Sequence, residues 1–420
     1  MMETTEALYS KFLQSTGVST DSRTVKEGNI FFALSGPSFN GNAYAKSAIE
    51  KGALVAVVDD HDYLGNGCVL VENALKALQK LAGHHRDHFK KPVLAITGSN
   101  GKTTTKELVR EVLAQKFIVQ ATEGNLNNHI GVPLTILKWT EETEMAIVEM
   151  GANHQKEIAS YCEYTRPTHG LITNIGHAHT EGFGGIEGVL RGKSELFDFI
   201  RKSDGIPFIN QEDERLSHMT KRFSKAESFP SDDVEILPGD QFLTLRVGGR
   251  EARTKLTGSY NFANAAAAVQ VGRHFGVSDE KIVSALENYQ PQNQRSQIIE
   301  RNGYTIIMDA YNANPDSMRA ALKNLSTFEG RKVAILGDMN ELSNSDEEHR
   351  SLGKEVMQMN FDEVILVGEK IKPALEFVPS ARHFGSTSEL VASGFKPQAS
   401  STVLLKASRS IKLEELLNSL

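Results

Sequence analysis

The chain has 420 residues, of which 40% are hydrophobic and 24% charged, and its formal net charge is −7. This length exceeds what one compact core accommodates and predicts about two or three domains. The negative charge argues against a general nucleic-acid-binding protein, because such a protein needs a basic surface.

Residues 1–90 form the first block of the sequence. They hold two short apolar runs, NIFFAL and ALVAVVDD, separated by the helix-like stretch AYAKSAIEKG. A longer helical stretch, ALKALQKLAGHHRDHF, closes the block before Lys91 and Pro92. We expect a small α/β domain here.

Residues 91–293 form the central block, in which apolar strands alternate with amphipathic helices. The strands are VLAIT, FIVQAT, MAIVEM, GLITNI and GIPFIN. Strands separated by helices predict a doubly wound, mostly parallel sheet covered on both faces. The later stretch VEILPGDQFLTLRVGGREARTKL alternates polar and apolar residues between glycine turns and predicts an antiparallel ribbon.

Residues 294–420 form the third block. Its predicted strands are YTIIMD, KVAILG, EVILVG and TVLLKA, each followed by helix-like sequence. The whole chain is therefore expected to be an α/β protein of three domains, in which the central one carries the most informative motif.

Two features bear on where the protein works. The cysteines, Cys68 and Cys162, are far apart and suggest neither a disulfide framework nor a zinc site. No apolar run approaches the roughly 18 residues that span a bilayer, and the first residues lack a signal peptide's basic start and apolar core. We expect a cytoplasmic protein without membrane insertion.

The motif follows the first central strand: TGSNGKTTTKE begins at Thr97. A strand that stops at Gly98 and restarts as a helix near Lys102 leaves backbone N–H groups free to bind an anion. Lys102 can reach phosphates, and the Thr103 hydroxyl can reach Mg²⁺. The strict phosphate-loop pattern would have glycine at Ile96, so a surface turn that happens to end in Gly-Lys is the alternative.

Further stretches, in this order, resemble the Mur ligases, the ATP-dependent amide-bond-forming enzymes of peptidoglycan precursor synthesis. They are DSRTVKEGNIFFALSGPSFNGNAYAKSAIEKGA, TGSNGKTTTKE, EGNLNNHIGVPLT, IVEMGANHQKEI, TNIGHAHTEGFGGIEGVLRGKSELF, GSYNFANAAAA, IMDAYNANPDSMRAAL and ILGDMNEL. The resemblance covers essentially the whole chain. It implies a UDP-sugar-binding first block, an ATP-binding central block and a third block that closes over the nucleotide.

Within the family, DAYNANPDSM together with GDMNEL implies a particular activity. This is the ATP- and Mg²⁺-dependent ligation of D-alanyl-D-alanine to UDP-N-acetylmuramoyl-tripeptide through an acyl phosphate. The partners implied are these small molecules, with no nucleic acid, and we expect a monomer. Two alternatives remain: a relative that adds another amino acid, such as glutamate to folate, and a nucleotide-driven switch ATPase.

The resemblance assigns the nucleotide and metal residues. The phosphate loop comprises Gly98, Ser99, Asn100, Gly101, Lys102, Thr103 and Thr104. The resemblance implies that Glu149 is a Mg²⁺ ligand together with Thr103, although a carboxylate at a strand end can also be a solvated boundary residue. His179 matches the family histidine at a second metal, whereas His177 is expected to be a hydrogen-bonded loop residue.

Lys193 matches a lysine that many Mur ligases carry as an N-carbamate and would then be a metal ligand; an ordinary helix-surface lysine is the alternative. The resemblance implies that Asn261 contacts the adenine. The alternative is that its side chain makes a hydrogen bond at the start of its helix. Arg295 and Asp309 are expected to meet the nucleotide from the third block, Asp309 at the ribose.

The same resemblance assigns substrate contacts. They are Ser22, Arg23, Asn125, Asn127, Asn128, Tyr311, Asn312 and Asn314. The chain departs from the family pattern at Asn42, His129 and Ala407, where histidine, glutamate and glycine are common.

Overall fold

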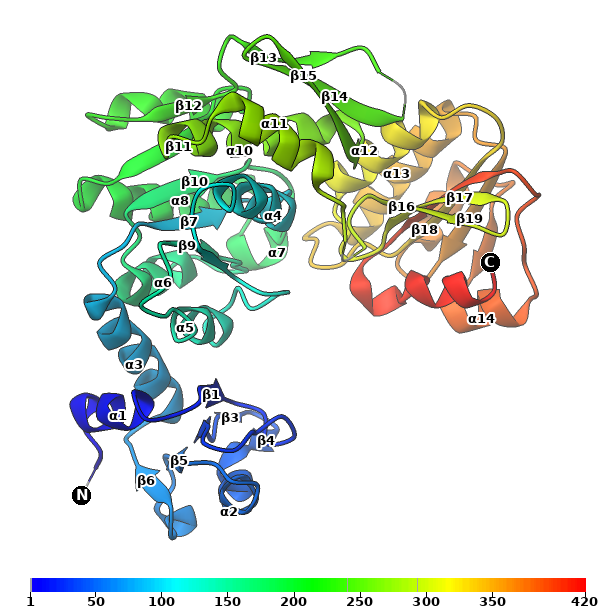
Figure 1. Ribbon diagram of the computed structural model, residues 1–420. Helices are drawn as coiled ribbons and strands as arrows, with labels where there is room; N and C mark the ends of the chain where they lie inside the picture. Colours follow the sequence, from blue (N-terminus) through cyan, green and yellow to red (C-terminus); the bar gives the residue numbers. More distant parts are fainter. Residues whose placement is uncertain (1, 240, 293) are drawn as a thin grey trace.

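The computed structural model describes residues 2–239, 241–292 and 294–420. Three α/β lobes follow one another in chain order (Figure 1). The first and central blocks are joined by a long helix, and the third block lies beside the central one. Within the described ranges, no helix is both long and apolar enough to cross a membrane.

The first block is built on a parallel sheet of order β1-β2-β5-β6. Its strands are β1 (Val18–Ser19), β2 (Ile30–Phe32), β5 (Val55–Val58) and β6 (Cys68–Leu70), with a small hairpin of β3 (Ser35–Gly36) and β4 (Phe39–Asn40). Its helices are α1 (Thr5–Phe12), α2 (Ala45–Glu50) and α3 (Ala74–His88), with 3₁₀ turns η1 (Gly41–Tyr44) and η2 (His61–Tyr63). Strands β2 and β5 are buried throughout, which explains their continuous apolar runs.

The central block contains a six-stranded parallel sheet of order β12-β11-β10-β7-β9-β8. Its strands are β7 (Val93–Thr97), β8 (Val119–Ala121), β9 (Met145–Glu149), β10 (His169–Ile172), β11 (Ile206–Asn210) and β12 (Glu227–Phe229). Strands β8 and β9 lie on one side of β7, and β10, β11 and β12 lie on the other, which is the doubly wound arrangement predicted. Strand β12 was not predicted.

Helices cover both faces of this sheet. They are α4 (Lys102–Leu113), α5 (Gly131–Ile136), α6 (Glu157–Thr165), α7 (Thr180–Phe183), α8 (Ile186–Lys202), α9 (Glu214–Ser217), α10 (Phe262–His274) and α11 (Asp279–Asn288), with η3 (His218–Arg222) and η4 (Ser259–Asn261). Strand β7 shows the two faces: Val93 and Ala95 pack with α3, α6 and α8, whereas Leu94 and Ile96 pack with α4 and α10. The predicted ribbon is also present, as the antiparallel strands β13 (Val234–Leu237), β14 (Phe242–Val247) and β15 (Arg250–Thr257).

The third block has a six-stranded sheet of order β16-β17-β21-β18-β19-β20. Its strands are β16 (Gln297–Arg301), β17 (Tyr304–Asp309), β18 (Lys332–Gly337), β19 (Glu363–Val367), β20 (Arg382–Phe384) and β21 (Thr402–Lys406). Its helices are α12 (Pro315–Ser326), α13 (Ser345–Gln358) and α14 (Thr387–Ala392), with η5 (Lys372–Glu376), η6 (Arg409–Ile411) and η7 (Leu413–Asn418). The four predicted strands are present, while the edge strands β16, which is antiparallel, and β20 were not predicted.

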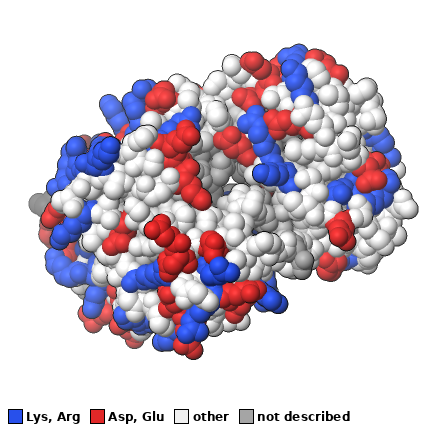
Figure 2. Space-filling model, turned by 90° about the horizontal axis from the view of Figure 1, so that it is seen from above, with Lys and Arg blue, Asp and Glu red and all other residues white. Residues whose placement is uncertain are grey.

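Charged side chains of both signs are interspersed over the face drawn in Figure 2, and among the residues drawn on it no extended basic surface forms. The molecule is hollowed between the central and third lobes in this view. The strongest candidate for a binding site lies in that hollow.

Candidate active site

A cavity of about 770 Å³ lies between the central and third blocks. It opens at the carboxyl ends of β7, β9 and β10, where a doubly wound sheet forms its crevice. Most of the predicted site residues line it: Ser99, Asn100, Gly101, Lys102, Thr103, Thr104, Asn125, Asn127, Asn128, Glu149, His179, Asn261, Arg295, Asp309, Tyr311, Asn312 and Asn314. The fold therefore brings together residues from two blocks that are up to about 200 positions apart in sequence.

The turn between β7 and α4 forms one wall of the cavity. Gly101 caps α4 with φ of 77°, and a Cβ atom there would stand 2.4 Å from Oδ1 of Asn264. Only glycine meets both demands, since other residues rarely adopt this backbone conformation. The first N–H groups of α4 then face the cavity without helical partners, which suits an anion.

Lys102 begins α4 and folds back over this turn. Its Nζ donates to the carbonyl oxygens of Gly98 at 2.7 Å and Ser99 at 3.2 Å. Burial lowers the pKa of Lys102 to about 8, the nearby Arg295 cation adds to this effect, and Glu149 opposes it. An anion in the cavity would favour the charged form of the ammonium group.

Glu149 ends β9 at the floor of the cavity and is almost fully buried. Its Oε1 accepts from Oγ1 of Thr103 at 3.1 Å and from Nδ2 of Asn127 at 2.7 Å. Its Oε2 is buried and has no hydrogen-bond partner among the described residues. A buried carboxylate oxygen without a partner, next to a threonine hydroxyl, matches the oxygen ligands that Mg²⁺ takes, so the residues present fit this ion.

The two histidines of the loop after β10 both contact the third block. Nδ1 of His179 contacts the carboxylate of Glu341, and this close contact lowers the pKa of Glu341. His177 binds Asp316, as described below, which agrees with a hydrogen-bonded loop role. Among the described residues, no group of three or more His, Cys, Asp or Glu side chains is arranged to hold a metal. A second metal at His179 therefore stays a prediction.

Lys193 lies in α8 behind the cavity wall and is completely buried. Its Nζ donates to the carbonyl oxygen of Ala152 at 3.0 Å and lies 5.1 Å from the ring centre of Phe183. Burial, followed by repulsion from Lys102, lowers the pKa of Lys193 well below its ordinary value. The alternative of a helix-surface lysine is thus wrong, and the environment favours a neutral amine.

The start of α10 forms the cavity wall on the side of the central block. Nδ2 of Asn261 donates to the carbonyl oxygen of Thr257 at 2.8 Å, and its Oδ1 accepts from Asn264 at 2.9 Å. Asn264 in turn accepts from Oγ1 of Thr105 in α4 at 3.0 Å. The side chain of Asn261 makes no capping hydrogen bond to α10. Asn264 instead ties α10 to α4, and Asn261 joins it to the end of β15.

The third block contributes cations and an aromatic ring. The guanidinium carbon of Arg295 lies 3.8 Å from the ring centre of Tyr311, and Nε of Arg295 is buried without a partner among the described residues. Asp309 lies 2.9 Å from Nζ of Lys406, which also donates to the carbonyl oxygen of Asn312 at 2.7 Å. Pro315 is the first residue of α12 rather than part of the preceding loop.

The amide-rich segment before α5 faces the same cavity. Oδ1 of Asn128 accepts from the N–H groups of Ile130 at 3.1 Å and Gly131 at 2.9 Å, so it organises the start of α5. Asn125 and His129 line the cavity beside it.

The first-block candidates lie elsewhere. In the structure as described, Ser22 and Arg23 do not line the central cavity: Arg23 pairs with Asp21 at 2.7 Å, and the Ser22 carbonyl accepts from Lys51 at 2.7 Å. Asn42 is buried and donates to Asp59 at 2.8 Å, in the wall of a separate pocket.

Several cavity residues were not predicted: Asn174, Asn264, Asp316, Glu341 and Lys406. Asn264 carried a signal, because it lies three positions after Asn261 on the same helix face. Asp316 follows Asn314 and Pro315 in a stretch typical of a helix start, but nothing local shows that it meets His177.

Family descriptions match three parts of the chain. Residues 14–86 match "Mur ligase family, catalytic domain", residues 96–272 match "Mur ligase middle domain", and residues 294–409 match "Mur ligase, glutamate ligase domain".

Individual relatives agree with these matches. The chain is 32% identical to UDP-N-acetylmuramoyl-tripeptide--D-alanyl-D-alanine ligase of Bacillus subtilis, over 96% of this chain and 93% of that protein. It is similar in structure to MurF from Acinetobacter baumannii, with a TM-score of 0.88, 31% identity and coverage of 99% and 98%. It is also similar to MurF ligase from Thermotoga maritima in complex with ADP, with a TM-score of 0.84, 26% identity and coverage of 97% and 97%.

Proposed function

The chain belongs to the Mur ligase family, and from this premise we propose that it joins D-alanyl-D-alanine to UDP-N-acetylmuramoyl-tripeptide. As a member of the family it is an ATP-dependent ligase that uses Mg²⁺. The proposed product is the pentapeptide precursor of peptidoglycan, made in the cytoplasm by a monomer. The observation that carries the proposal is one cavity lined by an anion-binding turn, a buried carboxylate and the third block's cations.

The reaction has two steps. The terminal carboxylate of the tripeptide attacks the γ-phosphorus of ATP, which gives an acyl phosphate and ADP. The amine of the dipeptide then attacks the acyl carbon. The C–O bond to the phosphate breaks, inorganic phosphate leaves with the electron pair of that bond, and the amine loses a proton. The difficulty in the first step is charge, because an anionic carboxylate must approach an anionic triphosphate.

The residues of the anion-binding turn address that difficulty. The first N–H groups of α4 and the ammonium of Lys102 offset phosphate charge. Glu149 and Thr103 would hold Mg²⁺, which when bound supplies charge neutralisation and alignment of phosphate oxygens. Asn261, Arg295 and Asp309 are proposed to hold the adenosine part, with Asp309 at the ribose.

The blocks are proposed to divide the substrates. The first block, residues 1–90, holds the UDP-sugar through Ser22 and Arg23. Residues 91–293 bind ATP, and residues 294–420 close over it. The peptide of the UDP-N-acetylmuramoyl substrate would meet Asn125, Asn127 and Asn128. Tyr311, Asn312 and Asn314 would line the nucleotide or dipeptide site. Closure would keep water from the acyl phosphate.

We also propose that Lys193 carries an N-carbamate. A neutral buried amine can add to CO₂ and release one proton, and the carbamate oxygens then become possible metal ligands beside His179. Crystallographic density at Lys193 tests this, because a bare amine there in a crystal with both metals bound would refute it.

Phosphate release is the experiment that tests the proposed ligation. It is measured with D-alanyl-D-alanine and with tripeptides that carry lysine or diaminopimelate at the third position. Release that requires both substrates, with the joined product identified by mass spectrometry, supports the proposal. Phosphate release with folate and glutamate instead would indicate the ligase that adds glutamate to folate. Equally fast phosphate release without either substrate would indicate a switch ATPase.

A further inference from the structure

Helix α12 of the third block contacts the central block at both of its ends. At its N-terminal end, Nδ2 of Asn314 donates to Oδ1 of Asn100 in the phosphate-binding turn at 2.7 Å. At its C-terminal end, Nδ2 of Asn324 donates to Oγ1 of Thr257 at 3.0 Å, and Oδ1 of Asn324 lies 3.2 Å from the same hydroxyl. A single rigid helix therefore spans the cavity rim between the phosphate-binding turn and the end of β15.

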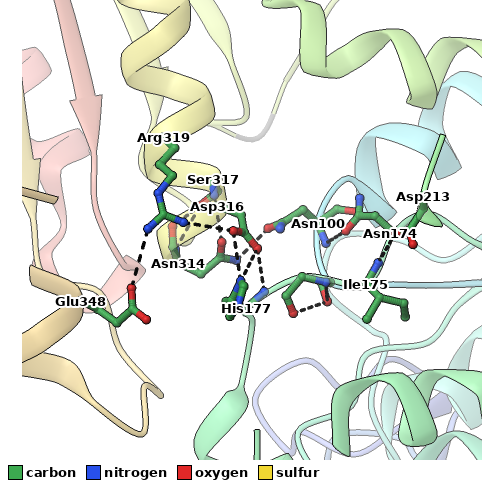
Figure 3. A network of polar contacts seen from close by, with 12 residues as sticks. Asn100, Asn174, Ile175, His177, Asp213, Asn314, Asp316, Ser317, Arg319 and Glu348 are labelled. Atoms are coloured by element: carbon green, nitrogen blue, oxygen red, sulfur yellow. Dashed lines mark hydrogen bonds and ion pairs between the residues drawn. The ribbon is translucent and has the colours of Figure 1, made fainter. Parts of the chain in front are cut away.

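The N-terminal contact includes a carboxylate. Oδ2 of Asp316 accepts from the backbone N–H of His177 at 2.7 Å, and both carboxylate oxygens lie 3.2 Å from Nδ1 of His177 (Figure 3). The approach is close, because a Cβ atom at Gly176 would stand 2.5 Å from Oδ2 of Asp316. A larger residue at position 176 would therefore displace the Asp316 carboxylate from this position.

These contacting groups are held in place within the third block. Oδ1 of Asn314 accepts from the N–H of Ser317 at 2.9 Å in a capping box, so the same amide starts α12 and reaches the central block. Asp316 is in the first turn of α12, where the helix dipole favours a carboxylate. Arg319 lies 3.5 Å from Asp316 and is tied at 2.6 Å to Glu355 of α13.

The partner on the other side is the phosphate-binding turn itself. The backbone of Asn100 is fixed by Asn174, whose Oδ1 accepts from its N–H at 3.0 Å, and by Thr173, whose Oγ1 donates to its carbonyl at 2.6 Å. Oδ1 of the Asn100 side chain then accepts the hydrogen bond from Nδ2 of Asn314. Docking of the third block therefore bears directly on a residue between the glycines of the turn.

The two ends of α12 differ in exposure. Asn324 and Thr257 are buried, 5% and 0% exposed, and Asn314 is 6% exposed, whereas the side chains of His177 and Asp316 are 44% and 33% exposed. A hydrogen bond open to water can exchange its partner for solvent at little cost, whereas a buried one cannot. The contact of Asp316 with His177 can therefore release while the C-terminal contact holds, and the single hydrogen bond from Asn314 to Asn100 then remains to be broken.

We propose that Asp316 and Asn314 form a latch that positions the third block on the phosphate-binding turn, with Thr257 and Asn324 as the pivot. Release of the latch opens the nucleotide cavity, and its closure completes that cavity. The proposal rests on the proposed function, since it assumes that the cavity binds ATP. Asp316 acts as a positioning residue, through His177 and the turn.

Two variants test the latch. Asp316→Ala removes the carboxylate, and Asn314→Asp keeps a good helix cap but loses the donor to Asn100. Asp346→Ala is the matched control, because Asp346 is the exposed second residue of α13 just as Asp316 is the second residue of α12. Circular dichroism checks folding, and Asn314→Asp decides the question if Asp316→Ala does not fold.

Small-angle scattering and calorimetric binding of MgADP are the measurements. We expect both latch variants to have a larger radius of gyration without nucleotide and to bind MgADP about five- to tenfold more weakly, because less protein is docked. Saturating MgADP should restore the parent's radius, and in turnover the KM for ATP should rise more than kcat falls. The control should match the parent.

A radius and an MgADP affinity in both latch variants equal to those of Asp346→Ala would overturn the latch. Scattering and MgADP binding need neither the UDP-sugar peptide nor the dipeptide. A failure of the proposed ligation would therefore leave these two results interpretable.

Discussion

Lys102 shows at the scale of one residue how the phosphate-binding turn is stabilised. Its ammonium occupies the carbonyl oxygens of Gly98 and Ser99, inside the same turn whose N–H groups face the cavity. An incoming phosphate can draw the ammonium outward without rearranging the backbone. Hydrogen bonds within the turn thus hold its backbone in place, which reduces the ordering cost of binding.

Replacing Lys102 by alanine should abolish useful turnover. The charge that offsets the γ-phosphate is lost where it matters most, and we expect kcat to fall roughly 100- to 1000-fold. Phosphate release under saturating substrates measures this. Binding of the UDP-sugar substrate, measured by thermal shift, should be unchanged in this variant. Near-normal turnover would contradict the proposed role of the turn.

The pKa of Lys102 makes a second prediction. Burial lowers the pKa of Lys102 to about 8, and phosphate binds the protonated ammonium form. MgADP affinity should therefore be flat below pH 8 and weaken above it, by at most about tenfold per pH unit for one coupled proton. Titration calorimetry between pH 7 and about 9.5 measures it. Lys102→Arg should show no such decline, because guanidinium stays charged.

At the scale of elements, a histidine pair joins α10 to the central sheet. Nε2 of His169 in β10 lies 3.2 Å from Nε2 of His274, and Nδ1 of His274 lies 3.0 Å from Glu227 in β12. Burial, with repulsion from His274, lowers the pKa of His169 to about 4. The pair lies at the start of β10, at the opposite end of the strand from the cavity.

Acid should weaken this junction. The unfolded chain takes up a proton near pH 6.5 that the folded protein refuses until about pH 4, so stability falls as the pH drops through this window. The loss attributable to His169 is roughly 3 kcal/mol at most. Urea unfolding of the parent and of His169→Gln at several pH values measures it.

The variant should show a flatter pH dependence than the parent. His61→Gln, a change at an exposed histidine, serves as the control. Equal pH slopes in His169→Gln and the parent would contradict the assignment.

Elements with a strong local signal were predictable from the sequence. Strand β7, turn and α4 were placed within a residue because a buried apolar run, two glycines and a helix start lie next to one another. Strand β16 was not, because Gln297–Arg301 is a half-buried edge strand whose antiparallel partner decides its conformation. The short strands β12 and β20 were missed for the same reason.

The candidate site was predictable only in part. The turn, Glu149 and the asparagines after β8 follow from local sequence and resemblance, and the structure places them on one cavity. The contacts of His177 with Asp316 and of His179 with Glu341 join residues more than a hundred positions apart. No periodicity records such pairs, because they depend on how two blocks dock.

At the scale of the whole molecule, the buried pair of Thr257 and Asn324 carries a prediction about cooperativity. Thr257→Val would leave the Asn324 amide buried without its partner, at a cost of roughly 1–3 kcal/mol. Because the pair joins two blocks, we expect the calorimetric unfolding transition of the variant to be broader than the parent's, or split. Thr254→Val is the matched control, since Thr254 is a buried threonine of the same strand that donates to Leu243 within the ribbon.

The control should lower the midpoint without separating the blocks. A single sharp transition in Thr257→Val, shifted no further than in the control, would contradict the pivot.

Two arginines fasten the joining helix α3 to the central block. Nε and Nη2 of Arg86 donate to the carbonyl oxygens of Thr165 at 2.9 Å and Arg166 at 3.0 Å, while Arg166 donates back to Gly83 at 2.9 Å. Dividing the chain at residue 90 would remove these hydrogen bonds, because their partners would then be on separate fragments. Separated there, Arg86 would lose the main-chain oxygens of Thr165 and Arg166, and Arg166 would lose that of Gly83, so the two lobes are best expressed as one unit.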